Sequence, residues 1–466
     1  MTKRSRTILF LALTAFFLLG TPSVILYSQG YRIDWNSKII AQTGGLYIKA
    51  TPGRADIYIN NEFVKRTDFI FNSTLLGNLL PKSYSVRIEK EGFEPWTKTL
   101  AIQPKQVTQV KNVILFPEER TFKSVFQNVS QFWPSPEGGK LILQKTFPDN
   151  SWDLVLWEPA QNQERTIAKG KAEEGILSLQ WAEDSSRILV RTISDKETAT
   201  AIWNLQGNQR DPCLLVACSL DFTGRNILEA SFVPQDPNQA AVLKSVRGSQ
   251  ELGIINYITK EPFTALASSV AAFTVQDKNL FYLTRDGTLL QKDLSSNAQP
   301  AALNEKAYPV QNETTYEIIP AGKDIFILEE HTKLSRLSPE KDFMVLSSNA
   351  NSVAPDKDGK RIAYTKGSEI RVLYLEANDQ LSLKQNSIVS LGSFGNTVLN
   401  LVWLENDYLA FTAGNEIKIS ETDSRDSVNA ISLGTYPDPG IFWEQNAKAL
   451  AVFSKGLVYV SEKLIP

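Results

Sequence analysis

The sequence has very few of the side chains on which catalytic and metal sites usually depend. Among 466 residues there is one histidine, His331, and there are two cysteines, Cys213 and Cys218. A histidine-based catalytic triad, or a zinc site with several histidines, would have to be built from His331 alone, so the composition argues against both. Chemistry that uses carboxylates alone is not excluded by these counts.

A charge imbalance is also lacking. The chain carries 49 basic and 51 acidic residues, a formal net charge of −2. Nucleic-acid-binding domains normally have a basic patch or stripe, so we expect no nucleic-acid partner. Neither a glycine-rich phosphate loop nor a Gly-x-Ser-x-Gly elbow occurs. We therefore predict no catalytic, cofactor-binding or metal-binding residues, and no cofactor.

One long apolar run is present, and no second run of the same length follows it. The run extends from Ile8 to Tyr27 after a short basic segment. About 20 apolar residues are enough to cross a hydrocarbon core as a helix. We predict a transmembrane anchor at residues 8–27 after a basic tail at residues 1–7. A signal peptide cleaved near Gly20–Ser23 is the alternative, although the apolar residues resume at Val24.

The basic tail also predicts the orientation of the chain. Lys and Arg remain on the cytoplasmic side of a membrane, so residues from about Ser28 onward would be extracytoplasmic. The expected location is the cytoplasmic membrane, with a single span and the N-terminus inside. Residues 28–43 would form a linker. Its aromatic residues Tyr31 and Trp35, with Tyr27, either lie at the membrane interface or are incidental.

Residues 44–117 alternate between apolar and polar positions in short segments separated by turn residues. This pattern predicts a small β domain. Asn60-Asn61 predicts a hairpin turn, because asparagine tolerates left-handed backbone geometry. The segment has no histidine, no cysteine and no clustered carboxylates, and we expect Phe93 and Trp96 to belong to its core. The expected strands are Gly45–Ala50, Ala55–Ile59, Tyr84–Ile88, Val107–Val110 and Val113–Phe116.

The order of these pieces resembles the PEGA domain family. The resemblance is carried by Pro52-Gly53-Arg54-Ala55, by the run from Leu80 to Val86, and by Glu91-Gly92-Phe93-Glu94-Pro95-Trp96. The sequence departs from the family where Pro-Glu-Gly-Ala reads Pro-Gly-Arg-Ala and where a Pro-Gly turn reads Pro81-Lys82. The resemblance implies an extracytoplasmic β-sandwich without catalytic residues, acting as a spacer or in contact with the cell wall or a protein.

Residues 118–466 repeat one pattern of an aromatic residue, a polar turn, an apolar strand and a further alternating strand. About eight such units, each of roughly 40–50 residues, have the period of a four-stranded propeller blade. Packing blades radially buries both faces of each sheet. We predict an all-β chain with one N-terminal helix, a small sandwich and a β-propeller of seven or eight blades, with eight preferred. The clearest units begin near Phe132, Leu179, Val353, Val402 and Phe442, and weaker ones centre on Phe232–Leu243, Phe273–Leu283 and Ile318–Leu328.

These units resemble TolB and WD40-like propeller repeats. The closest stretches are Ala354–Tyr364 and Trp133–Leu141, whereas the Gly-His and Trp-Asp signature of true WD40 blades is absent. The whole order, an anchor followed by a PEGA-like domain and a propeller-like array, resembles PEGA-containing membrane proteins of bacteria.

Several residues invite a functional interpretation and have a structural one. Trp133, Trp181, Trp403 and Trp443 recur at blade spacing, which favours a core role over ligand binding. The segment Asp356–Gly359 lacks the further oxygen ligands that a calcium loop needs, so a turn is expected there.

The histidine and the cysteines are also expected to be structural. His331 lies in a polar segment that predicts a solvent-exposed turn. In one strand, Cys213 and Cys218 would point to opposite faces about 16 Å apart. A disulfide needs Cα atoms within about 7 Å, and therefore a turn in the apolar segment Leu214–Ala217. Two buried free thiols are the favoured prediction, and a disulfide is the alternative.

The leading functional hypothesis is a non-enzymatic scaffold or binding protein of the cell envelope, whose propeller contacts a protein or a cell-wall polymer. One alternative is a propeller hydrolase or lyase that acts on envelope glycan through carboxylates in the channel. Another is an inert spacer.

Overall fold

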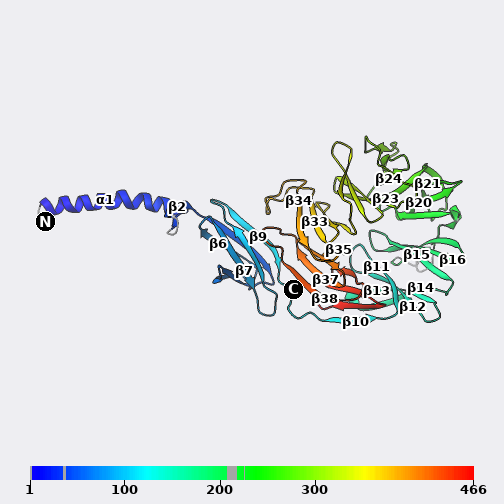
Figure 1. Cartoon of the computed structure of the whole chain (residues 1–466), viewed down its shortest axis with the longest axis horizontal. Helices are drawn as coiled ribbons and strands as arrows, with labels where there is room; N and C mark the ends of the chain where they lie inside the picture. The colour runs from blue at the N-terminus through cyan, green and yellow to red at the C-terminus, as the bar shows by residue number, and fades with distance from the viewer. Residues whose placement is uncertain (1–2, 35–37, 207–217, 225) are drawn as a thin grey trace.

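The structure is a computed structural model that describes residues 3–34, 38–206, 218–224 and 226–466 (Figure 1). Helix α1 (Lys3–Ser28) projects from the body along the longest dimension of the molecule. Its segment Ser5–Ser28 has 24 residues and a mean hydropathy of 2.2, and none of its most apolar window is buried. The helix is therefore long and apolar enough to cross a membrane.

A small hairpin follows the helix within the segment expected to be a linker. Strands β1 (Tyr31–Asp34) and β2 (Ile39–Gln42) pair antiparallel in a two-stranded sheet of their own. Trp35 lies outside the described residues.

The next unit is a sandwich of two sheets. One sheet has the order β6 (Ser73–Leu79), β3 (Gly44–Thr51), β9 (Val107–Ile114), with β3 and β9 parallel. The other has the order β5 (Glu62–Arg66), β4 (Asp56–Ile59), β7 (Ser83–Glu89), β8 (Trp96–Ala101). The inward residues of both sheets form one apolar cluster that includes Trp96, and Phe93 packs against it, as predicted. Asn60 and Asn61 have positive φ angles, which confirms the predicted hairpin turn.

The described part of residues 118–466 contains eight four-stranded antiparallel sheets arranged as propeller blades (Figure 1). The preferred count of eight blades is confirmed. In the first seven, the four strands follow one another in chain order. They are β11 (Val129–Pro134), β12 (Leu141–Thr146), β13 (Trp152–Glu158), β14 (Gln163–Gly170); β15 (Glu174–Trp181), β16 (Arg187–Ser194), β17 (Glu197–Asn204), β18 (Cys218–Ser219); β19 (Ile227–Phe232), β20 (Gln239–Val246), β21 (Ser249–Asn256), β22 (Thr264–Ala267); β23 (Val270–Gln276), β24 (Asn279–Thr284), β25 (Leu289–Asp293), β26 (Ala301–Ala302); β27 (Tyr316–Ala321), β28 (Asp324–Glu329), β29 (Lys333–Leu337), β30 (Phe343–Ser347); β31 (Val353–Pro355), β32 (Arg361–Lys366), β33 (Glu369–Tyr374), β34 (Ile388–Ser393); and β35 (Val398–Trp403), β36 (Tyr408–Ala413), β37 (Glu416–Glu421), β38 (Ala430–Thr435).

The eighth blade joins the two ends of the array. It contains β39 (Gly440–Glu444), β40 (Ala449–Ser454) and β41 (Leu457–Ser461), and its outermost strand is β10 (Phe122–Phe126) from the beginning of the array. Pairing of β10 with β41 closes the ring by hydrogen bonds between segments far apart in the sequence.

The repeated tryptophans lie on the first strand of their blades and belong to the core, as predicted. Trp181 and Trp443 are buried, and Trp133 and Trp403 pack against core clusters. Their indole groups also connect blades, because Trp181 Nε1 donates to the carbonyl of Trp133 at 3.1 Å. Trp403 Nε1 makes the equivalent bond to the carbonyl of Ala354 at 2.9 Å.

The acidic segment between β31 and β32 is a turn, as predicted. Oδ1 of Asp356 accepts hydrogen bonds from the backbone amides of Lys360 and Arg361, at 2.7 and 3.0 Å. Gly359 adopts a φ of 65° in this turn, a conformation that favours glycine. Its amide donates to the carbonyl of Asp356.

The prediction of two free thiols is wrong, because Cys218 is disulfide-bonded. Cys213, the only other cysteine in the sequence, lies outside the described residues. The prediction assumed one extended strand from position 213 to 218. Residues 213–217 of that segment lie outside the described residues.

Candidate functional site

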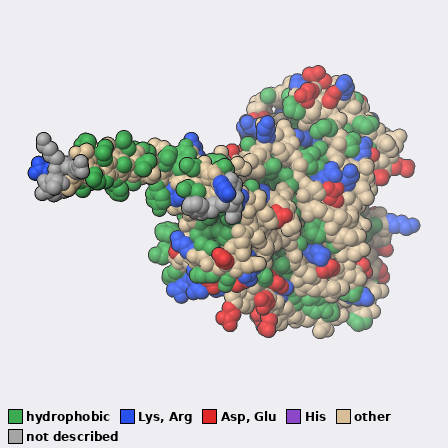
Figure 2. Space-filling view, turned by 60° about the vertical axis from the view of Figure 1, so that its left-hand side comes forward, with side chains coloured by type: hydrophobic (Ala, Val, Ile, Leu, Met, Phe, Trp, Pro, Cys, Tyr) green, Lys and Arg blue, Asp and Glu red, His purple; other side chains and the backbone are tan. Residues whose placement is uncertain are grey.

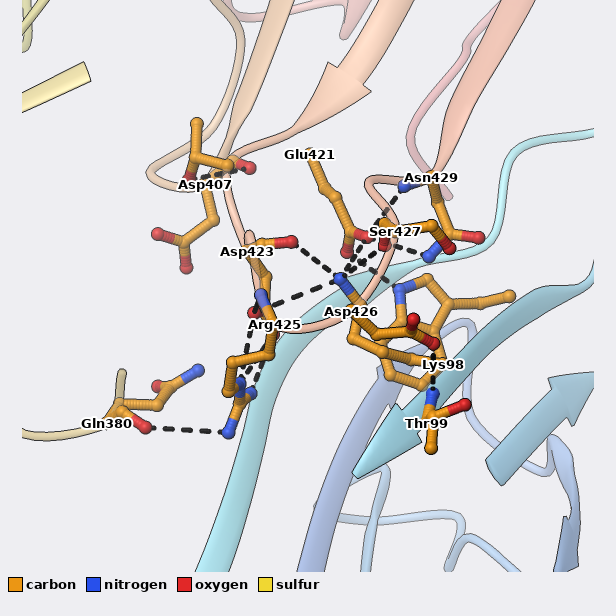
Figure 3. Close-up of polar contacts among 12 residues, drawn as sticks. Lys98, Thr99, Gln380, Asp407, Glu421, Asp423, Arg425, Asp426, Ser427 and Asn429 are labelled. Carbon is orange, nitrogen blue, oxygen red and sulfur yellow. Dashed lines mark hydrogen bonds and ion pairs between the residues drawn. The ribbon is translucent and has the colours of Figure 1, made fainter. Parts of the chain in front are cut away.

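The sandwich is attached to the seventh blade through a buried ion pair between Lys98 and Glu421 (Figure 3). Lys98 Nζ lies 2.7 Å from Glu421 Oε1, and the two side chains are 0% and 4% exposed. Glu421 Oε2 accepts a hydrogen bond from Trp96 Nε1 at 2.8 Å. Its Oε1 also accepts from the backbone and side-chain nitrogens of Asn429, at 2.8 and 2.7 Å. Glu421 therefore has hydrogen-bond donors from both domains.

The ammonium group of Lys98 is satisfied in the same way. Besides Glu421, it donates to the carbonyl oxygens of Asp423 at 2.5 Å and Ser427 at 3.0 Å. Both carbonyls belong to the loop that joins β37 to β38. Desolvating two charges costs several kcal/mol per ion, so such a pair is stable only when further hydrogen bonds satisfy both groups. This pair meets that condition.

The same loop covers the free edge of strand β8. The backbone amide of Thr99 donates to Asp426 Oδ2 at 2.7 Å. Asn429 Nδ2 donates to the carbonyl of Thr97 at 3.1 Å. These bonds involve outward-facing backbone groups of an edge strand, which would otherwise need water or another strand. The backbone hydrogen bond from Thr99 also lowers the pKa of Asp426.

A second set of contacts fixes the other sheet of the sandwich to the propeller. The backbone amide of Ile114 donates to the hydroxyl of Tyr408 at 2.9 Å, and Asn112 Nδ2 donates to Asp407 Oδ2 at 2.8 Å. Burial raises the pKa of Tyr408 well above its ordinary value. Arg361 from the neighbouring blade holds Asp407 by an ion pair of 3.0 Å. Both sheets of the sandwich thus contact the propeller, which fixes rotation as well as position. We refer to all these contacts as the joint.

The joint is at one end of the blades, and this determines which end remains open. Successive strands of a blade alternate in direction, so the loops after the first and third strands lie at the same end. The joint uses those loops in the seventh blade, where they contain Asp407 and Asp423. The opposite end carries the beginnings of the first strands and the turns between second and third strands, including His331. His331 is exposed in such a turn, as predicted.

Two glutamates stand at the open end on innermost strands. The first strands of several neighbouring blades contact one another, which makes them the inner strands of the ring. Glu229 is the third residue of β19 and Glu317 the second residue of β27, and both side chains are solvent-accessible. Exposed side chains on inner strands face the central channel, so this pair lies at its mouth.

The environment of these glutamates shifts their pKa values. Protein atoms surround Glu229 although water still reaches it, and this desolvation raises its pKa to about 7, with nearby Arg191 opposing the shift and Glu317 adding to it. Desolvation also raises the pKa of Glu317, and His331 opposes that shift. Glu229 therefore lies within electrostatic reach of Arg191 and Glu317, and Glu317 lies within electrostatic reach of His331. Among the described residues, no group of three or more His, Cys, Asp or Glu residues is arranged to hold a metal ion.

Neither site was identified from the sequence. The sequence could have indicated the role of Lys98, because this lysine occupies an inward position of β8 between Trp96 and Leu100. A lysine at such a position needs a buried partner. The sequence contains no such indication for Glu229 and Glu317, since a lone acidic residue in an apolar strand does not reveal whether it faces a channel.

One family model and several solved structures are similar to parts of this chain. Residues 43–115 match the PEGA domain family, which confirms the resemblance in the sequence. No curated protein sequence matches the chain. Among solved structures, the Dos1 propeller covers 74% of this chain and 95% of its own, with 11% identity and a TM-score of 0.47. The Cps50 (Swd1) β-propeller domain of Myceliophteria thermophila covers 73% and 99%, with 14% identity and a TM-score of 0.42. A prolyl endopeptidase covers 71% of this chain and 55% of its own, with 13% identity and a TM-score of 0.43.

Proposed function

We propose that this protein is a non-enzymatic scaffold of the cell envelope that holds a propeller at a fixed orientation outside the cytoplasmic membrane. Residues 1–7 form the cytoplasmic tail, residues 8–27 the anchor and residues 28–43 the connection. The sandwich at residues 44–117 is the spacer, and the propeller at residues 118–466 binds a protein or a cell-wall polymer.

The observation that carries this proposal is the joint. A flexible tether would need no buried ion pair between its domains, whereas Lys98 and Glu421 are buried and fully hydrogen-bonded across the interface. A fixed orientation is useful when one surface of the propeller must face a particular direction. The open end of the blades is that surface, because the joint occupies the opposite end.

The mouth of the channel favours a partner that carries a basic or amino group. Glu229 and Glu317 present two carboxylates there. A carboxylate with a raised pKa gains from a cationic partner, because the partner stabilises its charged form. Basic protein side chains have this chemistry, as do amino groups of wall polymers.

The same observation supports one alternative, a glycan hydrolase or lyase. A general acid works best when its pKa is near the operating pH, and Glu229 has a pKa of about 7. Glu317 would be the second carboxylate.

A co-sedimentation experiment separates these functions. Residues 28–466 are incubated either with isolated wall sacculi or with membrane protein extract. A Glu229→Gln/Glu317→Gln variant tests the open end, and Lys357→Ser in the β31–β32 turn is the control at the other end. Binding that the double variant loses and the control retains supports the scaffold.

The other outcomes of this experiment distinguish the scaffold from the enzyme and from the inert spacer. Release of wall fragments that requires Glu229 would replace the scaffold with the enzyme. No retention in either arm would leave the inert spacer as the explanation. Retention only from the extract would exclude a wall ligand and identify a protein partner.

A further inference from the structure

The β1–β2 hairpin exposes apolar side chains next to the end of the helix. Ile33 and Ile40 form a cross-strand pair on one face, and they are 51% and 60% exposed. A hairpin that is not part of a larger sheet is marginally stable in water. The sequence of the hairpin therefore fits an environment other than bulk water.

The hairpin is fixed to the last turn of α1 and to the sandwich. The guanidinium of Arg32 lies 3.6 Å from the centre of the Tyr27 ring, and its Nη1 donates to the Tyr27 carbonyl at 2.8 Å. Its Nη2 donates to Asn78 Oδ1, at the end of β6, at 2.9 Å. Thr43, after the hairpin, donates from its backbone amide to the carbonyl of Gly30 at 2.9 Å. These contacts fix the hairpin at the end of the helix, so its distance from the centre of a bilayer crossed by α1 is set by the position of the helix.

The length of the helix would place the hairpin at the surface of a bilayer. The apolar segment Ser5–Ser28 has 24 residues, which at 1.5 Å per residue span about 36 Å. A hydrocarbon core is about 30 Å thick, so the last turn emerges among the lipid headgroups. Figure 2 shows hydrophobic side chains along the helix as far as its junction with the sandwich. The hairpin, which directly follows the helix in the chain, exposes three further apolar side chains, Ile33, Ile39 and Ile40.

We propose that the β1–β2 hairpin is seated in the headgroup layer of the membrane that α1 crosses, with Ile33 and Ile40 at the acyl boundary. This inference rests on the proposed anchoring by α1. The hairpin then determines how the sandwich stands on the membrane, and the joint transmits that orientation to the open end of the propeller. The ligand of this surface is lipid.

The test uses the full chain in lipid nanodiscs with one environment-sensitive fluorophore at a time. The label is placed at Ile40→Cys in the hairpin, at Leu13→Cys in the helix, or at Ile70→Cys, all in a Cys213→Ser/Cys218→Ser background. Ile70 is a matched control because it is apolar and 77% exposed in the turn between β5 and β6. That turn is at the other end of β3 from the hairpin, about 26 Å away for eight residues.

We expect quenchers carried on lipid headgroups to quench the label at position 40 and aqueous iodide to quench the label at position 70. Adding Ile33→Asn should increase iodide quenching at position 40. A label at position 40 that behaves like the one at position 70, while position 13 is protected deep in the bilayer, would overturn the hairpin proposal and leave the anchor intact. Iodide quenching at position 13 would instead overturn the anchor.

Discussion

Lys98 and Glu421 connect two domains whose sequences give little indication that they meet. Both are charged and both are buried, so each depends on the other for its stability. Their environment differs from that of surface ion pairs such as Lys123–Glu462, whose side chains are 70% and 62% exposed. Exposed pairs contribute little to stability, because solvent screens them and both side chains lose conformational freedom.

We predict that Glu421→Gln lowers the free energy of unfolding of residues 28–466 by about 3–5 kcal/mol, because it removes the nearer and more deeply buried of the two carboxylates that face the Lys98 ammonium and leaves only Asp423, at 3.8 Å. Lys123→Met, at the exposed pair, should change it by at most about 1 kcal/mol. Urea unfolding followed by tryptophan fluorescence measures both values. Equal effects from the two variants would show that the buried pair contributes no more than an exposed one.

Glu229 gives a pH-dependent prediction. Its pKa is raised from 4.5 to about 7 in the folded chain, so folding favours the neutral acid. The stabilisation that the neutral Glu229 side chain gives to the folded state is fully present below about pH 4.5. It is lost as the pH rises through about 7. Glu229→Gln keeps the side chain neutral throughout. Thermal unfolding across this range should show the wild-type chain losing stability relative to the variant as the pH rises. A constant difference between the two chains would contradict the raised pKa.

At the scale of strands and blades, much of the structure could be predicted. Each blade has an apolar strand after a turn, and the centres at Phe232–Leu243, Phe273–Leu283 and Ile318–Leu328 coincide with the first hairpin of the third, fourth and fifth blades. Local alternation and turn chemistry determine such hairpins, so a sequence reveals them.

Contacts between distant segments could not be predicted in this way. Trp96 and Glu421 are 325 positions apart and have no shared local pattern. The disulfide at Cys218 was misjudged for a related reason, since local sequence alone does not show how two cysteines are brought together. Pairing of β10 with β41 likewise depends on the closure of the whole ring.

Because β10 closes the ring, we expect it to contribute more to the free energy of unfolding than other strands of its length. Phe126 is 9% exposed, belongs to the cluster between the first and eighth blades, and its ring lies 5.1 Å from that of Trp157. Phe126→Ala should lower the free energy of unfolding by about 3–5 kcal/mol. Val125→Ala on the same strand, where the side chain is 42% exposed, should change it by no more than about 0.5 kcal/mol. Similar values for the two variants would mean that β10 is dispensable for closure.

At the scale of the whole molecule, the helix, the sandwich and the propeller form a series of fixed connections. The helix is tied to the sandwich by Arg32, and the sandwich to the propeller by the joint. A chain built in this way transmits the orientation of its N-terminal helix to its far end, whereas a chain with flexible linkers does not. The inter-domain distance should therefore have a narrow distribution in solution.

We predict that spin labels at Glu62→Cys on the sandwich and Lys357→Cys on the propeller give one narrow distance distribution in pulsed electron resonance. Asn429→Ala should broaden it, because Asn429 donates to both Thr97 and Glu421 and so holds the loop against β8. The matched control is Asn238→Ala, an exposed asparagine in the β19–β20 turn of the third blade, away from the joint. A broad distribution in the parent chain would show that the two domains move independently. The fixed orientation on which the proposed scaffold function depends would then be absent, even if both domains remained folded.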